Sequence, residues 1–149
     1  MKRIVPAVTL VFAVLLAVSC ATSGEFSQDD ANAAFKKVYN RYRSSLILDG
    51  AKSYEVVKGD TLSAITVKYY GSDKGYYFPL IMLASSDVVL DPDLIEPGMK
   101  LSIPDLQKNL DDPEARGKMK VFFSDIAGVY NKKGNTAMEQ KLLEIADSL

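Results

Sequence analysis

The residue types that most often perform chemistry are scarce in this chain of 149 residues. It contains no histidine, so the commonest general base, the commonest metal ligand and the usual pH switch are all missing. Its one cysteine, Cys20, excludes an internal disulfide and any zinc site built from several cysteines. We therefore predict no catalytic residues, no metal site and no cofactor, and we expect binding rather than an enzymatic reaction.

Two polar segments could still suggest a site. The Asp-Pro-Asp segment at 91–93 carries two carboxylates, but it lacks the alternating acids, the glycine and the terminal Glu of a calcium loop. The Ser-Ser-Asp segment at 85–87 offers hydroxyl groups without a base that could activate them. A turn and a solvated loop are the simpler interpretations of these segments.

Cys20 stands at the end of a segment that is typical of a targeting signal. Lys2 and Arg3 precede an apolar run over residues 4–18, and small residues stand just before the cysteine. Because the run is shorter than the ~20 residues that span a bilayer, residues 1–19 are predicted to be a signal peptide. The segment resembles a lipoprotein signal, which implies that Cys20 is acylated and becomes the first residue of the mature chain. A plain signal peptide, or an uncleaved anchor with an incidental cysteine, is the alternative.

The charge of the chain restricts its partners. The net charge is -1. Removing residues 1–19 takes away two basic residues and no acidic one, which leaves 16 basic and 19 acidic residues and a net charge of -3. This balance argues against a nucleic-acid partner and against a basic patch for anionic lipid. Attachment to a membrane is therefore expected through acyl chains on Cys20, which would place the protein in the cell envelope, on the periplasmic side.

Apolar spacing predicts helices on both sides of a central module. A tether over 20–26 leads into an amphipathic helix over 27–50, which begins at Ser27. The central region, 53–104, is predicted as strand, helix, helix and strand, at 54–57, 62–70, 76–84 and 100–103. Pro79 lies either in the first turn of the second helix or breaks it. In the C-terminal region, 105–149, we predict one helix that starts at Pro113 and ends near Gly134, and another that begins with a capping box at Thr136.

The Gly-Asp-Thr-Leu segment at 59–62 turns the first strand sharply into a helix. Gly59 allows the turn, and either Asp60 or Thr61 can cap the helix. The other amide groups of the first helical turn would then point outward. Such donors suit a neutral acetamide or hydroxyl group.

Two motifs carry a resemblance to a known family. Residues 54–65, with Tyr-x-Val, Gly-Asp-Thr-Leu and a following Ile, resemble the opening of a LysM domain. Residues 91–104, with Asp-Pro-Asp, Ile, Pro-Gly and Leu-x-Ile-Pro, resemble its close. The resemblance implies an α+β fold, in which a small βααβ LysM module is flanked by α-helices at both ends. It also implies binding of peptidoglycan or a related N-acetylglucosamine glycan.

The resemblance further implies a shallow groove between two loops, where backbone groups read the acetamide and small apolar side chains receive its methyl group. The expected contacts are Gly59, Asp60, Thr61 and Leu62 on one loop, and Ser85, Ser86, Asp87, Leu94 and Ile95 on the other. The chain departs from the family pattern at Ser85, where Asn is frequent, and at Met99, where Gln is frequent. A serine lacks the two-sided hydrogen bonding of an amide, which bears on sugar affinity.

Two function classes follow from these features. The first is non-catalytic glycan binding by a lipid-anchored envelope protein, and the alternative is a LysM-fold scaffold without sugar affinity, whose flanking helices bind an envelope protein. The flanks carry apolar stripes too large for a soluble monomer to leave exposed together. We expect the N-terminal helix to pack against the C-terminal pair and form a helical layer beside the module.

Overall fold

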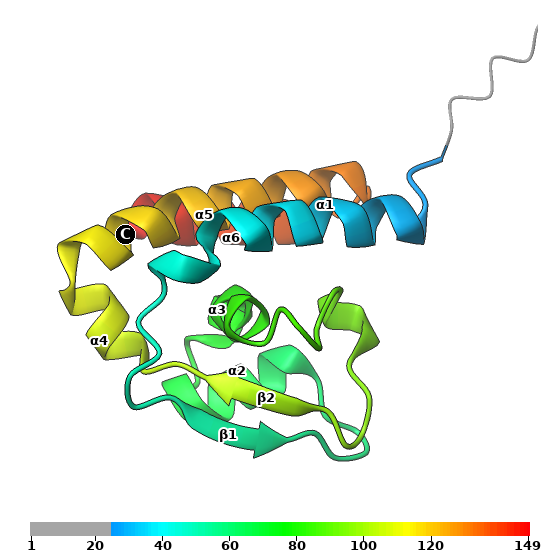
Figure 1. The fold of residues 1–149 in the computed structure, drawn as a ribbon. Coiled ribbons are helices and arrows are strands. Elements are labelled where there is room, and N and C mark those ends of the chain that lie inside the picture. The colour runs from blue at the N-terminus through cyan, green and yellow to red at the C-terminus, as the bar shows by residue number, and fades with distance from the viewer. Residues whose placement is uncertain (1–24) are drawn as a thin grey trace, which may run out of the picture.

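The computed structural model describes residues 25–149 (Figure 1). One part is a module made of β1 (Lys52–Glu55), α2 (Leu62–Tyr70), α3 (Phe78–Ala84) and β2 (Lys100–Ile103). The other is a helical layer made of α1 (Gln28–Tyr42), α5 (Pro113–Lys132) and α6 (Thr136–Ser148). Shorter elements complete the chain, namely α4 (Leu106–Asp111) and the 3-10 helices η1 (Arg43–Ser45), η2 (Gly75–Tyr77) and η3 (Pro92–Leu94).

The predicted signal peptide over 1–19 and the predicted lipidation site Cys20 lie outside the described residues, as does most of the tether. Within residues 25–149, no helix combines the length and the apolar character that a bilayer crossing requires.

The sheet of the module pairs β1 with β2 in antiparallel register. Tyr54 lies opposite Leu101, and Glu55 lies opposite Lys100. Two backbone hydrogen bonds extend the pairing, since Val56 donates to Met99 at 2.9 Å and accepts from Gly98 at 2.8 Å. β2 has its predicted bounds, whereas β1 begins two residues before the predicted 54–57.

The first helix of the module has the ends that its sequence predicts. The Thr61 hydroxyl accepts a hydrogen bond from the amide of Ala64 at 3.2 Å and so caps α2. Gly71 ends the helix with a φ of 111°, which a side chain at this position would strain. The buried face of α2 consists of Leu62, Ile65 and Thr66.

The second helix, α3, lies between the sheet and the helical layer (Figure 1). Pro79 occupies its first turn, so the proline starts the helix and does not break it. Six of the seven α3 residues are buried. Aromatic contacts join this region to α5, because the Phe78 ring lies edge-on to Tyr130 at 6.3 Å and the Tyr77 ring lies edge-on to Phe123 at 5.6 Å.

The predicted helical layer is confirmed. The rings of Phe35 and Tyr130 meet edge to face at 5.7 Å between α1 and α5, and Tyr42 meets Phe122 in the same way. Leu142 of α6 is fully buried in the same core. The apolar stripes of the flanking segments therefore cover one another, and one continuous core joins the layer to the module.

The helix predicted over 27–50 is shorter than expected. It ends at Tyr42, and only η1 follows it. The side chain of Asn109, from α4, accepts a hydrogen bond from the Ile47 amide at 2.8 Å and donates to the Ile47 carbonyl at 3.0 Å. Gly50, at a φ of 82°, then turns the chain toward β1. Asn109, which is 62 residues away in the sequence, thus provides the hydrogen bonds of Ile47 in place of the helical ones that the apolar spacing had predicted.

Two features of the C-terminal region also differ from expectation. Helix α4 was not predicted from the sequence, and it is capped by Asp105, whose carboxylate accepts a hydrogen bond from the Lys108 amide at 3.0 Å. The cap of α6 is Asn135, which accepts from the Met138 amide, and not Thr136. Glu139, the expected partner of Thr136 in a capping box, accepts a hydrogen bond from Asn131 at 2.7 Å instead.

Candidate functional site

The turn between β1 and α2 is held by its own aspartate. The Asp60 carboxylate accepts hydrogen bonds from the Val57 amide at 2.9 Å and from the Tyr54 hydroxyl at 2.8 Å. These two bonds lower the pKa of Asp60 below its usual value, and the bond from the Val57 amide has the larger effect. Gly59 supports the turn with a φ of 94°. Asp60 therefore builds the turn, and its carboxylate is already engaged.

The start of α2 offers backbone donors. Thr61 is exposed, and its hydroxyl satisfies the Ala64 amide. Leu62 and Ser63 precede the first residues with partners in the helix, so their amide groups point outward from its positive end. The Leu62 side chain is 3% exposed and belongs to the core. Leu62 was expected to contact a ligand, but only its backbone is available to do so.

A second segment lies directly beside this turn. The backbone bonds of Val56 with Gly98 and Met99 hold the end of β1 against the point where the chain enters β2, directly after residues 94–97. Leu94 remains 51% exposed and Ile95 is half-buried. We call residues 57–61 together with residues 94–98 the loop pair. Five of the predicted contacts belong to these two segments, namely Gly59, Asp60, Thr61, Leu94 and Ile95.

Ser85 was predicted in the same site, and the structure places it elsewhere. It is 2% exposed, and its hydroxyl accepts a hydrogen bond from the Ser102 amide at 2.9 Å. Ser102 is four residues from Gly98 along an extended strand, roughly 13 Å. Ser85 therefore clamps α3 to β2. Ser86 is half-buried and Asp87 exposed, and among the described residues no hydrogen bond joins either to the loop pair.

Two further residues of this region gain a role from the structure. Val57 is 56% exposed at the start of the loop pair, although the sequence analysis did not single it out. Strand alternation was the available signal, because Val56 is buried and the next side chain must face the other way. Met99, found where the family often has Gln, accepts a hydrogen bond from the Glu96 amide on its sulfur and closes the turn into β2.

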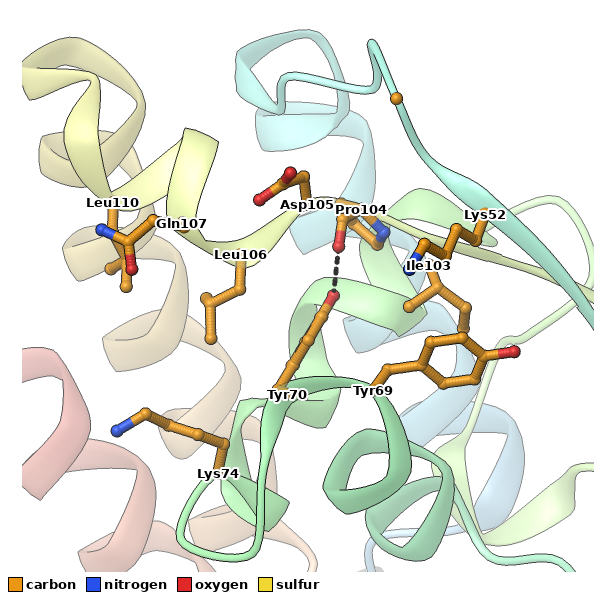
Figure 2. Close-up of a pocket in the computed structure, with 11 residues that line it drawn as sticks. Lys52, Tyr69, Tyr70, Lys74, Ile103, Pro104, Asp105, Leu106, Gln107 and Leu110 are labelled. Atoms are coloured by element: carbon orange, nitrogen blue, oxygen red, sulfur yellow. Dashed lines mark hydrogen bonds between the residues drawn. The ribbon is translucent and has the colours of Figure 1, made fainter.

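A cavity of about 310 Å³ lies at the opposite end of the module (Figure 2). Its walls include Lys52, Tyr69, Tyr70, Pro104 and Leu106, and none of the predicted glycan contacts lines it. Tyr70 donates a hydrogen bond to the Pro104 carbonyl at 2.9 Å, and burial raises its pKa well above the usual range. The nine residues of α2 separate the cavity from the loop pair by about 13 Å, so the two are distinct sites.

Comparison with known proteins identifies the module. Residues 54–104 match the LysM domain family, so this part of the chain is a LysM domain. LysM domains in general bind peptidoglycan and chitin-like glycans. With helices on both sides of the domain, the chain has the predicted α+β architecture.

Two relatives match a segment of about the size of the LysM domain. Esterase MT1326 and Esterase Rv1288, from two strains of Mycobacterium tuberculosis, are each 33% identical over 63 residues. The match covers 42% of this chain and 13% of each esterase, so the chain corresponds to a small part of their length. No solved structure matches the chain.

Proposed function

We propose that this protein binds peptidoglycan or a related N-acetylglucosamine glycan without cleaving it, and that the loop pair is the binding site. The observation that carries the proposal is the composition of the loop pair within a LysM domain. Each of its two segments carries an exposed apolar side chain, Val57 in one and Leu94 in the other, and the first segment leads into the outward amide groups at the start of α2.

These groups complement an N-acetylated sugar. Backbone amides donate to the acetamide carbonyl, and the acetamide methyl group gains by leaving water for the apolar surface of Val57 and Leu94. The site needs no ionised ligand, because the carboxylate of Asp60 is already engaged in the turn. A small neutral site makes few desolvated contacts, so a single domain should bind weakly.

A binding experiment tests this proposal. The chain from residue 20 onward should co-sediment with insoluble peptidoglycan or chitin, and soluble fragments should remain intact after incubation. Replacing Val57 and Leu94 by serine should weaken binding several-fold without changing the circular dichroism spectrum. Val121→Ser is the matched control, since Val121 is 50% exposed on α5, far along the chain from the loop pair. Background sedimentation of the wild-type chain with several glycans would reject the proposal in favour of a scaffold.

The scaffold alternative was suggested by Ser85 and Met99, which depart from the family pattern, and by the flanking helices. The apolar stripes of these helices pack against one another within the chain, so the stripes do not call for a protein partner. The name esterase describes the relatives, and the segment that they share with this chain is the size of the LysM domain alone. We therefore propose a binding role and not an enzymatic one.

We also propose that the protein is held in the cell envelope by acyl chains on Cys20. Support comes from the order of charged, apolar and small residues before the single cysteine. Each buried methylene contributes about 0.8 kcal/mol, and stable anchoring requires two signals, for example two acyl chains. Cells fed a fatty-acid analogue should label the wild-type protein and not Cys20→Ala, and an unlabelled wild-type protein would reject the anchor.

A further inference from the structure

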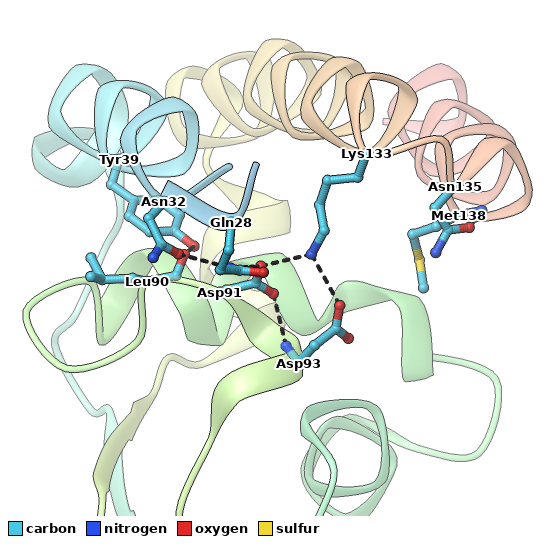
Figure 3. A network of polar contacts seen from close by, with 9 residues as sticks. All are labelled: Gln28, Asn32, Tyr39, Leu90, Asp91, Asp93, Lys133, Asn135 and Met138. Atoms are coloured by element: carbon cyan, nitrogen blue, oxygen red, sulfur yellow. Dashed lines mark hydrogen bonds and ion pairs between the residues drawn. The ribbon is translucent and has the colours of Figure 1, made fainter. Parts of the chain in front are cut away.

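The residues that lead into the second segment of the loop pair are hydrogen-bonded to residues outside the LysM domain. That segment begins after Asp91, which caps η3 by accepting a hydrogen bond from the Asp93 amide at 3.0 Å through one carboxylate oxygen. The other oxygen accepts from Lys133 at 2.6 Å and from Gln28 at 2.8 Å (Figure 3). Gln28 is the first residue of α1, and Lys133 follows α5.

The ion pair in this network is buried. The Asp91 side chain is fully buried, and that of Lys133 is 17% exposed. Removing one partner of such a pair leaves an uncompensated charge in a low dielectric, so the two side chains hold each other in place. The ammonium group of Lys133 also lies over the rings of Phe35 and Tyr130, at 5.7 and 5.6 Å from their centroids. Aromatic rings in the core of the helical layer therefore help to position the Lys133 side chain that binds Asp91.

The neighbours of Asp91 are held from the same side. The Tyr39 hydroxyl, from α1, donates to the Leu90 carbonyl at 3.1 Å. Lys133 also reaches the Asp93 carboxylate at 3.1 Å. In the part of the chain that the structure describes, every hydrogen bond that leaves residues 90–95 goes to α1 or to Lys133.

The other segment of the loop pair is held differently. Asp60 binds Tyr54 and Val57, which both lie within the LysM domain. One segment is thus built by the domain itself. The other is held by the domain at its end, through Gly98 and Met99, and is preceded by residues 90–93, which the helical layer holds. A binding site made of both segments therefore depends on the layer for the approach to its second segment.

We propose that Lys133, Gln28 and Tyr39 are positioning residues for glycan binding, although none of them belongs to the LysM domain. They hold residues 90–93, directly before Leu94 and Ile95, and so they influence where these two residues stand relative to the turn at Gly59. This inference rests on the proposed function of the loop pair. It makes the helical layer a component of the binding site rather than an independent attachment.

The test compares Lys133→Met with Lys132→Met in the chain from residue 20 onward. Methionine removes the charge of Lys133 and keeps an apolar stem, and Lys132 is an exposed neighbour that supplies a matched control. Two quantities are measured well below the melting temperature: the Kd for a soluble chitooligosaccharide, and the hydrogen exchange rate of the amides in residues 94–98. We expect Lys133→Met to raise the Kd about tenfold and to speed exchange in residues 94–98, while Lys132→Met changes neither.

Tyr39→Phe provides a milder variant, should Lys133→Met fail to fold. It removes only the hydroxyl that holds the Leu90 carbonyl, and it should raise the Kd by a smaller factor. A residue that merely stabilises the fold would lower the melting temperature and leave the Kd of the folded protein unchanged.

Unchanged affinity and unchanged exchange in both variants would overturn the positioning role. A wild-type chain that binds no chitooligosaccharide and no peptidoglycan would instead overturn the proposed function. The exchange rates alone would then decide whether Lys133 holds residues 90–93.

Discussion

The two helices of the LysM domain, α2 and α3, differ in how much of their surface is buried. Three of the nine residues of α2 are buried, so one face packs against α3 and η2 and much of the rest meets water. Six of the seven residues of α3 are buried, because the sheet covers one side and the helical layer covers the other (Figure 1). A helix that is apolar all round needs cover all round. The composition of α3 therefore shows that this domain is built to sit beneath another layer.

Removing the cover should have the largest effect. A chain that ends at Pro104 lacks α5 and α6, and it exposes Phe78 and the rest of the upper side of α3. We expect no cooperative thermal transition in calorimetry, since each large apolar side chain returned to water costs about 1.5–3 kcal/mol. A truncated module that melts like the intact chain would show that α3, like α2, does not need the helical layer for its stability.

Single truncations of side chains should reproduce the contrast. Ile81 of α3 is fully buried, and Ile81→Ala should cost about 2–5 kcal/mol in the free energy of unfolding. Val67 of α2 is 37% exposed, and Val67→Ala should cost well under about 1 kcal/mol. Urea titration of both variants measures the difference. Equal losses would contradict the assignment of α3 to a two-sided core.

The contact between module and layer should depend on pH through Asp91 and Lys133. Burial acts to raise the pKa of Asp91, but hydrogen bonds from Lys133, Gln28 and the Asp93 amide outweigh it and lower the pKa. Burial likewise opposes the charge of Lys133, and its bonds to Asp91 and Asp93 raise its pKa overall. The pair therefore stabilises fully between about pH 4 and about pH 10.

Below that window, stability should fall as pH drops through the lowered pKa of Asp91, and above it stability should fall as pH rises through the raised pKa of Lys133. At pH 7, Lys133→Met should cost about 3 kcal/mol. The double variant with Asp91→Asn should lose less and should have a flatter stability profile at acid pH. Identical profiles of the wild type and the double variant would contradict the role of the pair.

A small effect is expected at the start of α2. Its first turn relies on the Thr61 hydroxyl, whereas α3 starts with Pro79 in its first turn and has no side-chain cap. Thr61→Ala should cost about 1 kcal/mol, and Thr61→Ser should restore most of it. A comparison of midpoints in urea, with Thr61→Ser as the control, is sufficient. A loss of stability in Thr61→Ser equal to that in Thr61→Ala would argue against capping.

The features predicted correctly from the sequence are those with a local cause. Thr61 and Gly71 mark the two ends of α2, and the partners that they need lie within four residues. The predicted turn at 91–93 is likewise confirmed, since Asp91 binds the Asp93 amide. The helical layer was predictable because apolar stripes must be covered.

The features that were missed have distant partners. The second oxygen of Asp91 binds residues 42 and 63 positions away, and Ser85 binds a strand 17 positions away. Asn109, 62 positions away, binds Ile47, where the helix predicted over 27–50 is not helical. Spacing along the chain carries no information about such contacts. The resemblance to LysM domains located the loop pair, and only the fold showed that Ser85 is buried outside it.

The two-stranded sheet also bears on how the protein behaves at high concentration. Each strand pairs with the other on one side, which leaves two outer edges that could accept a strand from another copy. Both strands are only four residues long, and exposed charged side chains stand at Lys52, Glu55 and Lys100. A short, charged edge is a poor template for intermolecular pairing, so these strands resist aggregation and leave the loop pair at their end uncovered.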